Sequence, residues 1–387
     1  MENIEVIGVI ELNDFMLNPQ GIRDQLLKWR RDKFEPNQKI VFIWGEVEYF
    51  YHGHPTGFST HNFLTVVKSC DISLSVFVFL VAYSNFKKSI APFLTDSNDE
   101  PIIHEMLLLH PMYPYLLFDP EPSIGKNKDI IYPACSLLGT PRVHRNLFFK
   151  YLIKENLLDY VHVNYNVNSH PGDRSDIHTN TLEHPEVAHL NLIKTQAYTY
   201  WNESWAQYPK FNLFSQLDQI QIPLVTASDT LSIDNVAECI SWNQQTDYQF
   251  LKHFAINIVC ETQFDIPTQW TSEKTLRAIM FQMPFIIFGP QHVLKRLHGF
   301  GFKTFDRYWD ESYDDIADAQ ERFIKTCELV KQVVTLPLDK LKLMYVDMLP
   351  ILQYNQQCLS DYINNVYIPV HAKYGLKPTP LVYDDPN

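Results

Sequence analysis

Apolar runs of strand length alternate along this chain with segments of helical spacing. Residues 254–260 form an apolar run that ends at Glu261, which is the pattern of a buried strand. Residues 273–283 have helical composition, and residues 285–288 form a second apolar run that is closed by Gly289. A strand, a helix and a second strand in this order are the building block of a parallel sheet. The hydrophobic pattern therefore predicts an α/β protein.

The same alternation covers much of the chain. Further strands are predicted at residues 4–12, 39–44, 73–83, 134–138 and 160–165, with a short one at 303–305. Further helices are predicted at residues 18–33, 63–70, 144–156, 291–297, 317–334, 341–356 and 358–366. Two prolines and a glycine make residues 119–132 a candidate linker. We therefore expect an N-terminal domain at residues 1–125, a second domain at 126–350, and a C-terminal helix and tail at 351–387.

The composition supports two domains that each bury a core. The chain has 387 residues, of which 45% are hydrophobic and 20% are charged. Its formal net charge of −13 does not favour long-range attraction to duplex nucleic acid. Six cysteines are scattered without close pairing, which favours a reducing compartment over a disulfide framework or a zinc site. No signal peptide or bilayer-spanning stretch is evident, so a cytoplasmic protein is expected.

The start of the helix after residues 254–260 carries candidate binding chemistry. Ser272 is a favourable N-cap, and Glu273 suits the positive end of a helix, whereas Lys274 does not. A lysine in this turn is favourable when an anion such as phosphate sits on the helix terminus. Glu273 could then accept the hydroxyls of a ribose, and Trp270 could stack on a base. An exposed charge pair at a helix start is the simpler interpretation of the local sequence.

A second helix start in the chain has similar chemistry. The predicted strand at 134–138 is followed by a turn with Gly139 and by Arg142, His144 and Arg145 at the start of a helix. Guanidinium groups bind diphosphate oxygens in a forked geometry. This segment therefore predicts a second anion site, unless it is an ordinary surface-charged helix start.

Residues 254–290 also resemble the donor-binding motif of the alpha-1,3-fucosyltransferases. The shared features are an aromatic residue, two further residues, Glu-Lys, a helix, and then Pro, a hydrophobic run and Gly-Pro. Glu261 resembles the acidic residue of that family at the end of the preceding strand, whereas Thr262 stands where the family usually has Asn. Over the whole chain, the Gly-Phe-Lys-Thr-Phe run at 301–305 and Asp-Glu-Ser-Tyr-Asp at 310–314 resemble glycosyltransferases encoded by bacteriophages and other large viruses.

The resemblance implies a GT-B-like fold, in which two Rossmann-like domains face a central cleft and the second domain holds a nucleotide sugar. It implies a GDP- or UDP-linked donor and an acceptor that is a glycan, a small molecule or a modified nucleic-acid base. It also implies a C-terminal helix that can cross back to the N-terminal domain. For a viral protein the expected location is the host cytoplasm.

On this hypothesis, Arg142, Arg145 and Lys274 stabilise the leaving diphosphate without a bound metal. The chain has no Asp-x-Asp motif, and the spacing of its histidines at 170, 178, 184 and 189 matches no standard zinc pattern. An inverting reaction, which we favour, needs a general base. Glu46 and Glu48, just past the strand at 39–44, are the candidates for it, with the histidines at 52 and 54 as alternatives. A retaining reaction needs no such base.

Two other functions fit the same residues. The fold could serve as a non-catalytic module that binds a nucleotide sugar or has a structural role. The chain could also be a viral glycosyltransferase that modifies hydroxylated DNA bases, although its acidic balance argues against duplex DNA.

Overall fold

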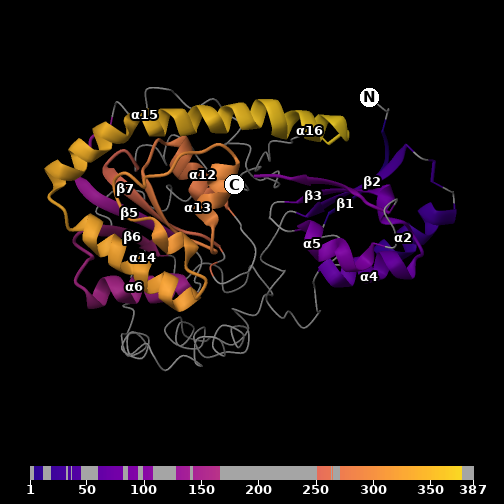
Figure 1. Cartoon of the computed structure of the whole chain (residues 1–387), viewed down its shortest axis with the longest axis horizontal. Helices are drawn as coiled ribbons and strands as arrows, with labels where there is room; N and C mark the ends of the chain where they lie inside the picture. Colours follow the sequence, from indigo (N-terminus) through magenta and orange to yellow (C-terminus); the bar gives the residue numbers. More distant parts are fainter. Residues whose placement is uncertain are drawn as a thin grey trace, which may run out of the picture. The chain divides into compact units, whose positions relative to one another are not determined.

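The computed structural model describes residues 4–11, 19–31, 34–35, 37–44, 60–81, 86–94, 99–107, 128–139, 143–165, 251–262, 264 and 271–376. These residues form an α/β protein with two parallel sheets, as predicted (Figure 1). The chain divides into two compact units. Unit 1 comprises Met1–Pro114, Thr268–Thr271 and Asp361–Asn387, and unit 2 comprises Tyr115–Pro267 and Ser272–Ser360. The predicted domain boundary after residue 125 lies outside the described residues.

The sheet of unit 1 contains parallel strands in the order β1-β2-β3-β4. Its strands are β1 (Glu5–Glu11), β2 (Gln38–Trp44), β3 (Phe77–Val81) and β4 (Ile102–Glu105). The helices between them are α2 (Pro19–Arg31), α4 (Thr60–Ser69) and α5 (Phe86–Ile90), with 3-10 turns at Leu74–Val76 and Ala91–Phe93. Because the strands advance in one direction, right-handed crossovers place these helices on one face of the sheet (Figure 1).

Aromatic packing and one glycine bring the helices of unit 1 onto its sheet. The rings of Phe42 on β2 and Phe63 on α4 have centroids 4.1 Å apart, and Phe79 on β3 packs against both. On β1, a Cβ atom added to Gly8 would lie 2.3 Å from the indole of Trp29 on α2. Only a residue without a side chain therefore permits this contact between α2 and β1.

The C-terminal residues complete unit 1. The long helix α15 (Leu338–Tyr362) begins in unit 2, and the residues from Asp361 onward belong to unit 1. A π-helical turn at Ile363–Tyr367 and helix α16 (Ile368–Lys373) follow α15. The backbone N–H of Leu107, just past β4, donates to the Tyr362 hydroxyl at 2.7 Å, and His104 Nε2 lies 2.8 Å from the Tyr374 hydroxyl. Tyr362 and Tyr374 are thus bonded to the β4 region.

The sheet of unit 2 contains parallel strands in the order β6-β5-β7-β8. Its strands are β5 (Tyr132–Gly139), β6 (Val161–Tyr165), β7 (Phe254–Cys260) and β8 (Phe285–Phe288). Its helices are α6 (Val143–Lys154), α12 (Glu273–Met280), α13 (Val293–Gly299), α14 (Ala319–Val334) and most of α15, with a 3-10 turn at Ser312–Asp315. Each described residue of β7 and β8 is buried, as their continuous apolar runs predict.

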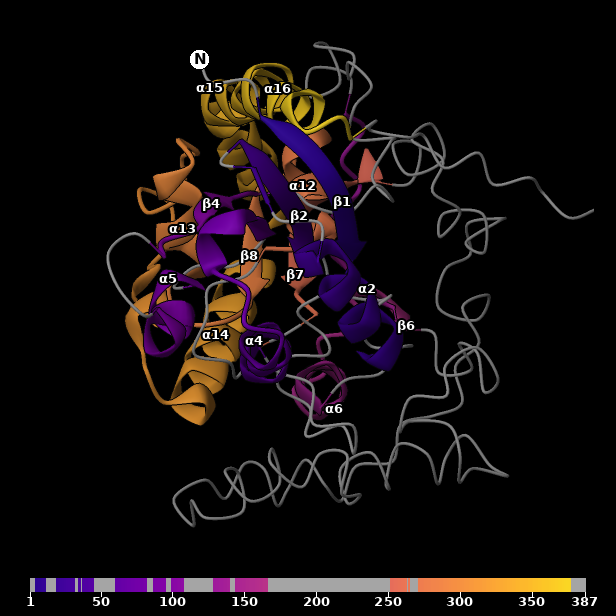
Figure 2. The same cartoon turned by 90° about the vertical axis from the view of Figure 1, so that its right-hand side faces the viewer.

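Helices cover both faces of this second sheet. Phe288 on β8 packs against Phe148 of α6 and Phe323 of α14, which places these two helices on one face. Figures 1 and 2 show α12 and α15 on the opposite side of the sheet. This two-sided arrangement is compatible with a Rossmann-like fold. No helix of the described ranges is both long and apolar enough to cross a membrane.

Some predicted elements differ from those observed. The helices predicted at 341–356 and 358–366 are largely one helix, α15, which continues through Pro350. The helix predicted at 273–283 ends at Met280, because Gln282 adopts a left-handed φ of 50°. The short strand predicted at 303–305 is a loop. Its backbone is held by Asn355 of α15, which bonds the N–H and the carbonyl of Lys303, both at 2.8 Å.

Candidate functional site

The direction of the strand order in unit 2 reverses between β5 and β7. From β5 the chain moves outward to β6, and it then returns to the other side of β5 to form β7 and moves outward again to β8. The helices that follow the two central strands, α6 and α12, consequently lie on opposite faces of the sheet. In open α/β sheets, ligands bind outside the carboxyl ends of strands at such a reversal.

The first turn of α6 is bound to the end of β7. His144 and Arg145 are almost fully buried, with exposures of 1% and 2%. His144 Nε2 donates to the carbonyl of Glu261 at 2.8 Å. One guanidinium nitrogen of Arg145 donates to the carbonyls of Cys260 and Glu261, at 3.2 and 3.0 Å. The predicted anion-binding side chains therefore contact the main chain that leaves β7.

Glu261 joins that same main chain to α12. Both oxygens of its carboxylate accept the backbone N–H of Ser272 at 3.1 Å, and one also accepts the hydroxyl of Thr275 at 2.5 Å. Burial raises the pKa of Glu261 above its ordinary value, while the charge of Lys274 and these hydrogen bonds oppose the shift. The glutamate predicted to touch a sugar ring thus anchors the N-terminus of α12.

The first turn of α12 carries the predicted Glu-Lys pair. Ser272 is the N-cap, as predicted, and its hydroxyl accepts the N–H of Lys274 at 3.2 Å. The ammonium of Lys274 forms an ion pair with Glu273 and donates to the Thr262 hydroxyl at 3.3 Å. Burial raises the pKa of Glu273, but the charge and hydrogen bond of Lys274 outweigh it and leave that pKa below its ordinary value.

An ammonium has three N–H donors, and two of those on Lys274 are used by these contacts. The third has no hydrogen-bond partner among the residues that the structure describes. The Lys274 side chain is 15% exposed, so this donor lies near the surface of the site.

The charges of the two helix starts meet at the end of β7. Arg145 and Lys274 both act electrostatically on the thiol of Cys260, the last residue of that strand. Burial nevertheless raises the pKa of this thiol to about 12, so it stays protonated at neutral pH and is no nucleophile. The first turns of α6 and α12 thus bring an arginine and a lysine to the end of β7, beside the carboxylates of Glu261 and Glu273.

The structure brings together a majority of the predicted binding residues: His144, Arg145, Glu261, Ser272, Glu273 and Lys274. Arg142, Trp270, Glu46 and Glu48 lie outside the described residues, as do the histidines at 52, 54, 170, 178, 184 and 189. Within the described part of the chain, no group of three His, Cys, Asp or Glu side chains is placed to hold a metal ion.

Sequence reasoning missed the part played by Thr275. Its position three residues after the N-cap Ser272 is where a capping box has Glu or Gln. Here the carboxylate comes from Glu261 at the end of the preceding strand, and Thr275 donates to it. A polar residue at this position, after a strand that ends in an acid, is the signal that could have indicated the contact.

Comparisons with protein-family models, with curated proteins and with solved structures found no match for this chain. The function is therefore inferred from the site itself.

Proposed function

We propose that the carboxyl edge of the unit 2 sheet binds the diphosphate of a nucleotide sugar, and that the protein is a glycosyltransferase. The observation that carries the proposal is the convergence of two helix N-termini on residues 260–262, at the reversal of strand order. Both termini offer partial positive charge, and Arg145 and Lys274 add full charges at the same place. In this proposal, units 1 and 2 correspond to the acceptor and donor domains of the GT-B architecture.

The leaving group of glycosyl transfer is a nucleoside diphosphate, which gains negative charge as the bond to the sugar breaks. Preorganised cations lower the free energy of that charged state. Lys274 would donate its third N–H to a phosphate oxygen. Arg145 would make no direct contact with the phosphate, and its positive charge would act on it across the Cys260–Glu261 main chain. Glu273, held in place by Lys274, would accept the ribose hydroxyls. Glu46 and Glu48 remain the proposed bases for an inverting reaction.

A binding module without catalysis is the second candidate. The observation in its favour is that both described cations of the site already have protein partners: Arg145 has carbonyls, and Lys274 has Glu273 and Thr262. A site of this kind could hold a nucleotide sugar and leave it intact.

The test is a panel of GDP- and UDP-linked sugars, with binding measured by calorimetry and donor hydrolysis measured by released nucleotide. We expect one donor to bind and to be hydrolysed by the wild type. Lys274→Ala should weaken that binding about tenfold or more, since a charge-assisted contact to phosphate contributes roughly 1.5–3 kcal/mol.

Lys295→Ala is the matched control, because Lys295 is an exposed lysine in the first turn of α13 in the same unit. It should leave donor binding unchanged, and Lys274→Arg should retain much of it. Binding without hydrolysis would favour the non-catalytic module. Equal binding by wild type and Lys274→Ala, with both proteins folded, would contradict the proposed site.

A further inference from the structure

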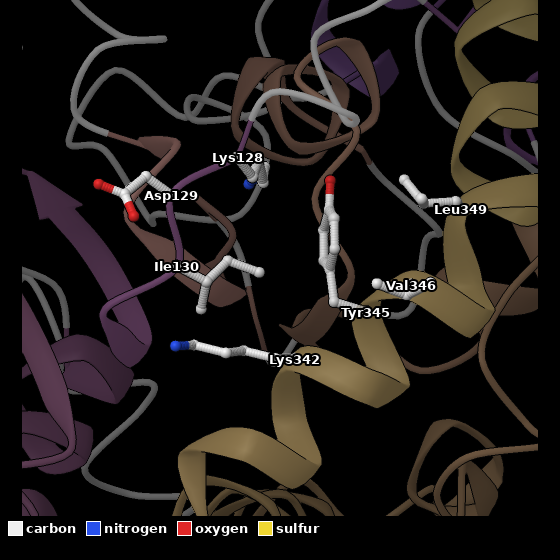
Figure 3. A pocket seen from close by; sticks show the side chains of 7 residues that line it. All are labelled: Lys128, Asp129, Ile130, Lys342, Tyr345, Val346 and Leu349. Carbon is white, nitrogen blue, oxygen red and sulfur yellow. The ribbon is translucent and has the colours of Figure 1, made fainter.

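A separate pocket lies at the other end of the unit 2 sheet, near the amino ends of its strands. It has a volume of about 270 Å³ and is formed by the segment that leads into β5 and by one face of α15 (Figure 3). Lys128, Asp129 and Ile130 belong to that segment, which precedes the first residue of β5. Because the proposed donor site follows the last residues of β7, the length of the parallel strands separates the two places.

The half-buried side chain of Lys128 lies at one end of this pocket. The Lys128 ammonium donates to the carbonyls of Leu251 and Phe254, at 3.1 and 3.3 Å, and it contacts the sulfur of Met283. It also lies 5.2 Å from the centre of the Tyr345 ring. Burial lowers the pKa of Lys128 to about 7. The ammonium is thus held near the pocket, with its donors directed at the protein.

The middle of the pocket is apolar. Figure 3 shows the side chain of Ile130 pointing toward the ring of Tyr345, with Val346 and Leu349 on the α15 side. Tyr345 is buried, and its hydroxyl is occupied by the carbonyl of Gln282 at 2.9 Å, so that the ring face is what it offers to a ligand. Val346 is 61% exposed, so an apolar side chain is open to solvent at the mouth of the pocket.

A second cation borders the pocket at the surface. Lys342 is exposed on α15, and it has no ion-pair or hydrogen-bond partner within the described ranges. Asp129 is also exposed, but its carboxylate points away from the pocket (Figure 3). Lys342 thus brings a positive charge to the border of this apolar space, whereas the donors of Lys128 are directed at the protein, in a chain whose formal net charge is −13. Charge complementarity thus favours an anion over a cation.

We propose that this pocket binds a small amphipathic anion, with its apolar body between Ile130 and Tyr345 and its negative group at Lys342. The volume lies just below the usual range for drug-sized ligands, roughly 300–1,000 Å³, so the ligand would be a compact aromatic or aliphatic carboxylate. Such a ligand covers Val346 and gives the ammonium of Lys342, which has no partner among the described residues, an anionic partner. This inference does not depend on the proposed glycosyl transfer.

The probe is 3-phenylpropionate, titrated into the full chain by calorimetry and compared with 3-phenylpropanamide, which has the same shape without the charge. We expect saturable binding of the carboxylate and binding of the amide that is roughly threefold to fivefold weaker, the effect of a partly exposed ion pair. Lys342→Gln should weaken carboxylate binding by the same factor and leave amide binding unchanged.

Lys340→Gln supplies the matched control, because it removes an equal charge from the exposed surface of the same helix outside the pocket. It should leave the affinity for the carboxylate unchanged. Val346→Glu, at an exposed position where folding is not at risk, should weaken binding of both probes and of the carboxylate more. The proposal would be overturned by equal effects of Lys340→Gln and Lys342→Gln or by equal affinities for the acid and the amide. It would also be overturned by a preference for 3-phenylpropylammonium or by the absence of saturable binding.

Discussion

Glu311 shows how one side chain in this fold can make stability depend on pH. Its carboxylate accepts the Thr304 hydroxyl and the backbone N–H of Phe305, at 2.5 and 2.8 Å, and Thr304 is also bonded to His298 at 2.9 Å. Burial raises the pKa of Glu311 to about 7 from an ordinary value of 4.5, although both hydrogen bonds oppose the shift. The folded protein therefore holds the carboxyl proton of Glu311 more tightly than the unfolded chain does.

The raised pKa of Glu311 predicts the effect of Glu311→Gln. The stability due to the bound proton is complete below about pH 4.5 and is lost as the pH rises through about 7. A neutral glutamine removes this dependence, so the variant should match the wild type near pH 4 and exceed it near pH 8 by about 1–2 kcal/mol. Urea unfolding at both pH values measures this.

Glu328→Gln is the control for charge alone, because Glu328 is exposed on α14. It should not reproduce the divergence between the two pH values. A Glu311→Gln variant that is less stable than the wild type at pH 8 would show that the ionised carboxylate is favoured at this position.

At the scale of single elements, the start of α12 depends on contacts from two directions. The Ser272 hydroxyl caps the helix from within, and the Glu261 carboxylate holds the Ser272 N–H from the end of β7. Ser272→Ala removes the first contact and keeps the second. We expect a loss of about 1 kcal/mol in the free energy of unfolding, while Ser272→Thr retains a hydroxyl and much of the stability. Chemical denaturation of the three proteins tests this, and equal stability of the alanine variant would refute the cap.

The contact between α2 and β1 gives a second test at this scale. Gly8→Ala places a methyl group where the Trp29 indole lies, and the helix must shift to make room. We expect a loss of about 1–3 kcal/mol in the stability of unit 1. Gly299→Ala makes the same chemical change at the end of α13, where nothing lies within 4 Å of the new atom, and should be neutral or slightly stabilising. Thermal unfolding distinguishes the two outcomes.

Individual elements were predictable where the hydrophobic pattern was unbroken. Residues 254–260 and 285–288 were predicted as strands with the observed bounds, because continuous apolar runs fit a buried parallel strand. The single helix α15 was predicted as two, and the first of them ended with Asn355 and Gln356. Both are buried, and Gln356 donates to the carbonyl of Met280 at 2.8 Å. Partners so distant in sequence leave no local pattern.

Contacts between residues that are distant in the sequence also limit what the sequence could predict about the site. The order of strands and helices was enough to predict polar side chains at the starts of two helices. It could not show that Arg145 would contact the carbonyls of Cys260 and Glu261, which lie more than a hundred residues away in the chain. Nor could it show that Glu261 would anchor Ser272.

At the scale of the whole molecule, each unit should respond separately to substitutions in its own contacts. Tyr362→Phe removes the hydroxyl that accepts the buried N–H of Leu107 in unit 1. We expect a cost of about 1–3 kcal/mol, because that N–H is left without its acceptor. Amide hydrogen exchange should accelerate in β3 and β4 and stay unchanged in β7 and β8.

Tyr308→Phe is the matched change in unit 2, where the hydroxyl makes an exposed bond to Asp347 at 2.8 Å. Its effect should be small and confined to unit 2. Exchange that rises equally in both sheets of the Tyr362 variant would mean that the chain unfolds as one cooperative body.

The bond between Leu107 and Tyr362 has a consequence during synthesis of the chain. The four strands of the first sheet leave the ribosome early, yet the tyrosines that bond to the β4 region follow only after more than two hundred further residues. Domains generally fold as they emerge, beginning at the N-terminus. Here the first unit to emerge is completed last, so nascent chains should expose the β4 region to chaperones until translation reaches Tyr374.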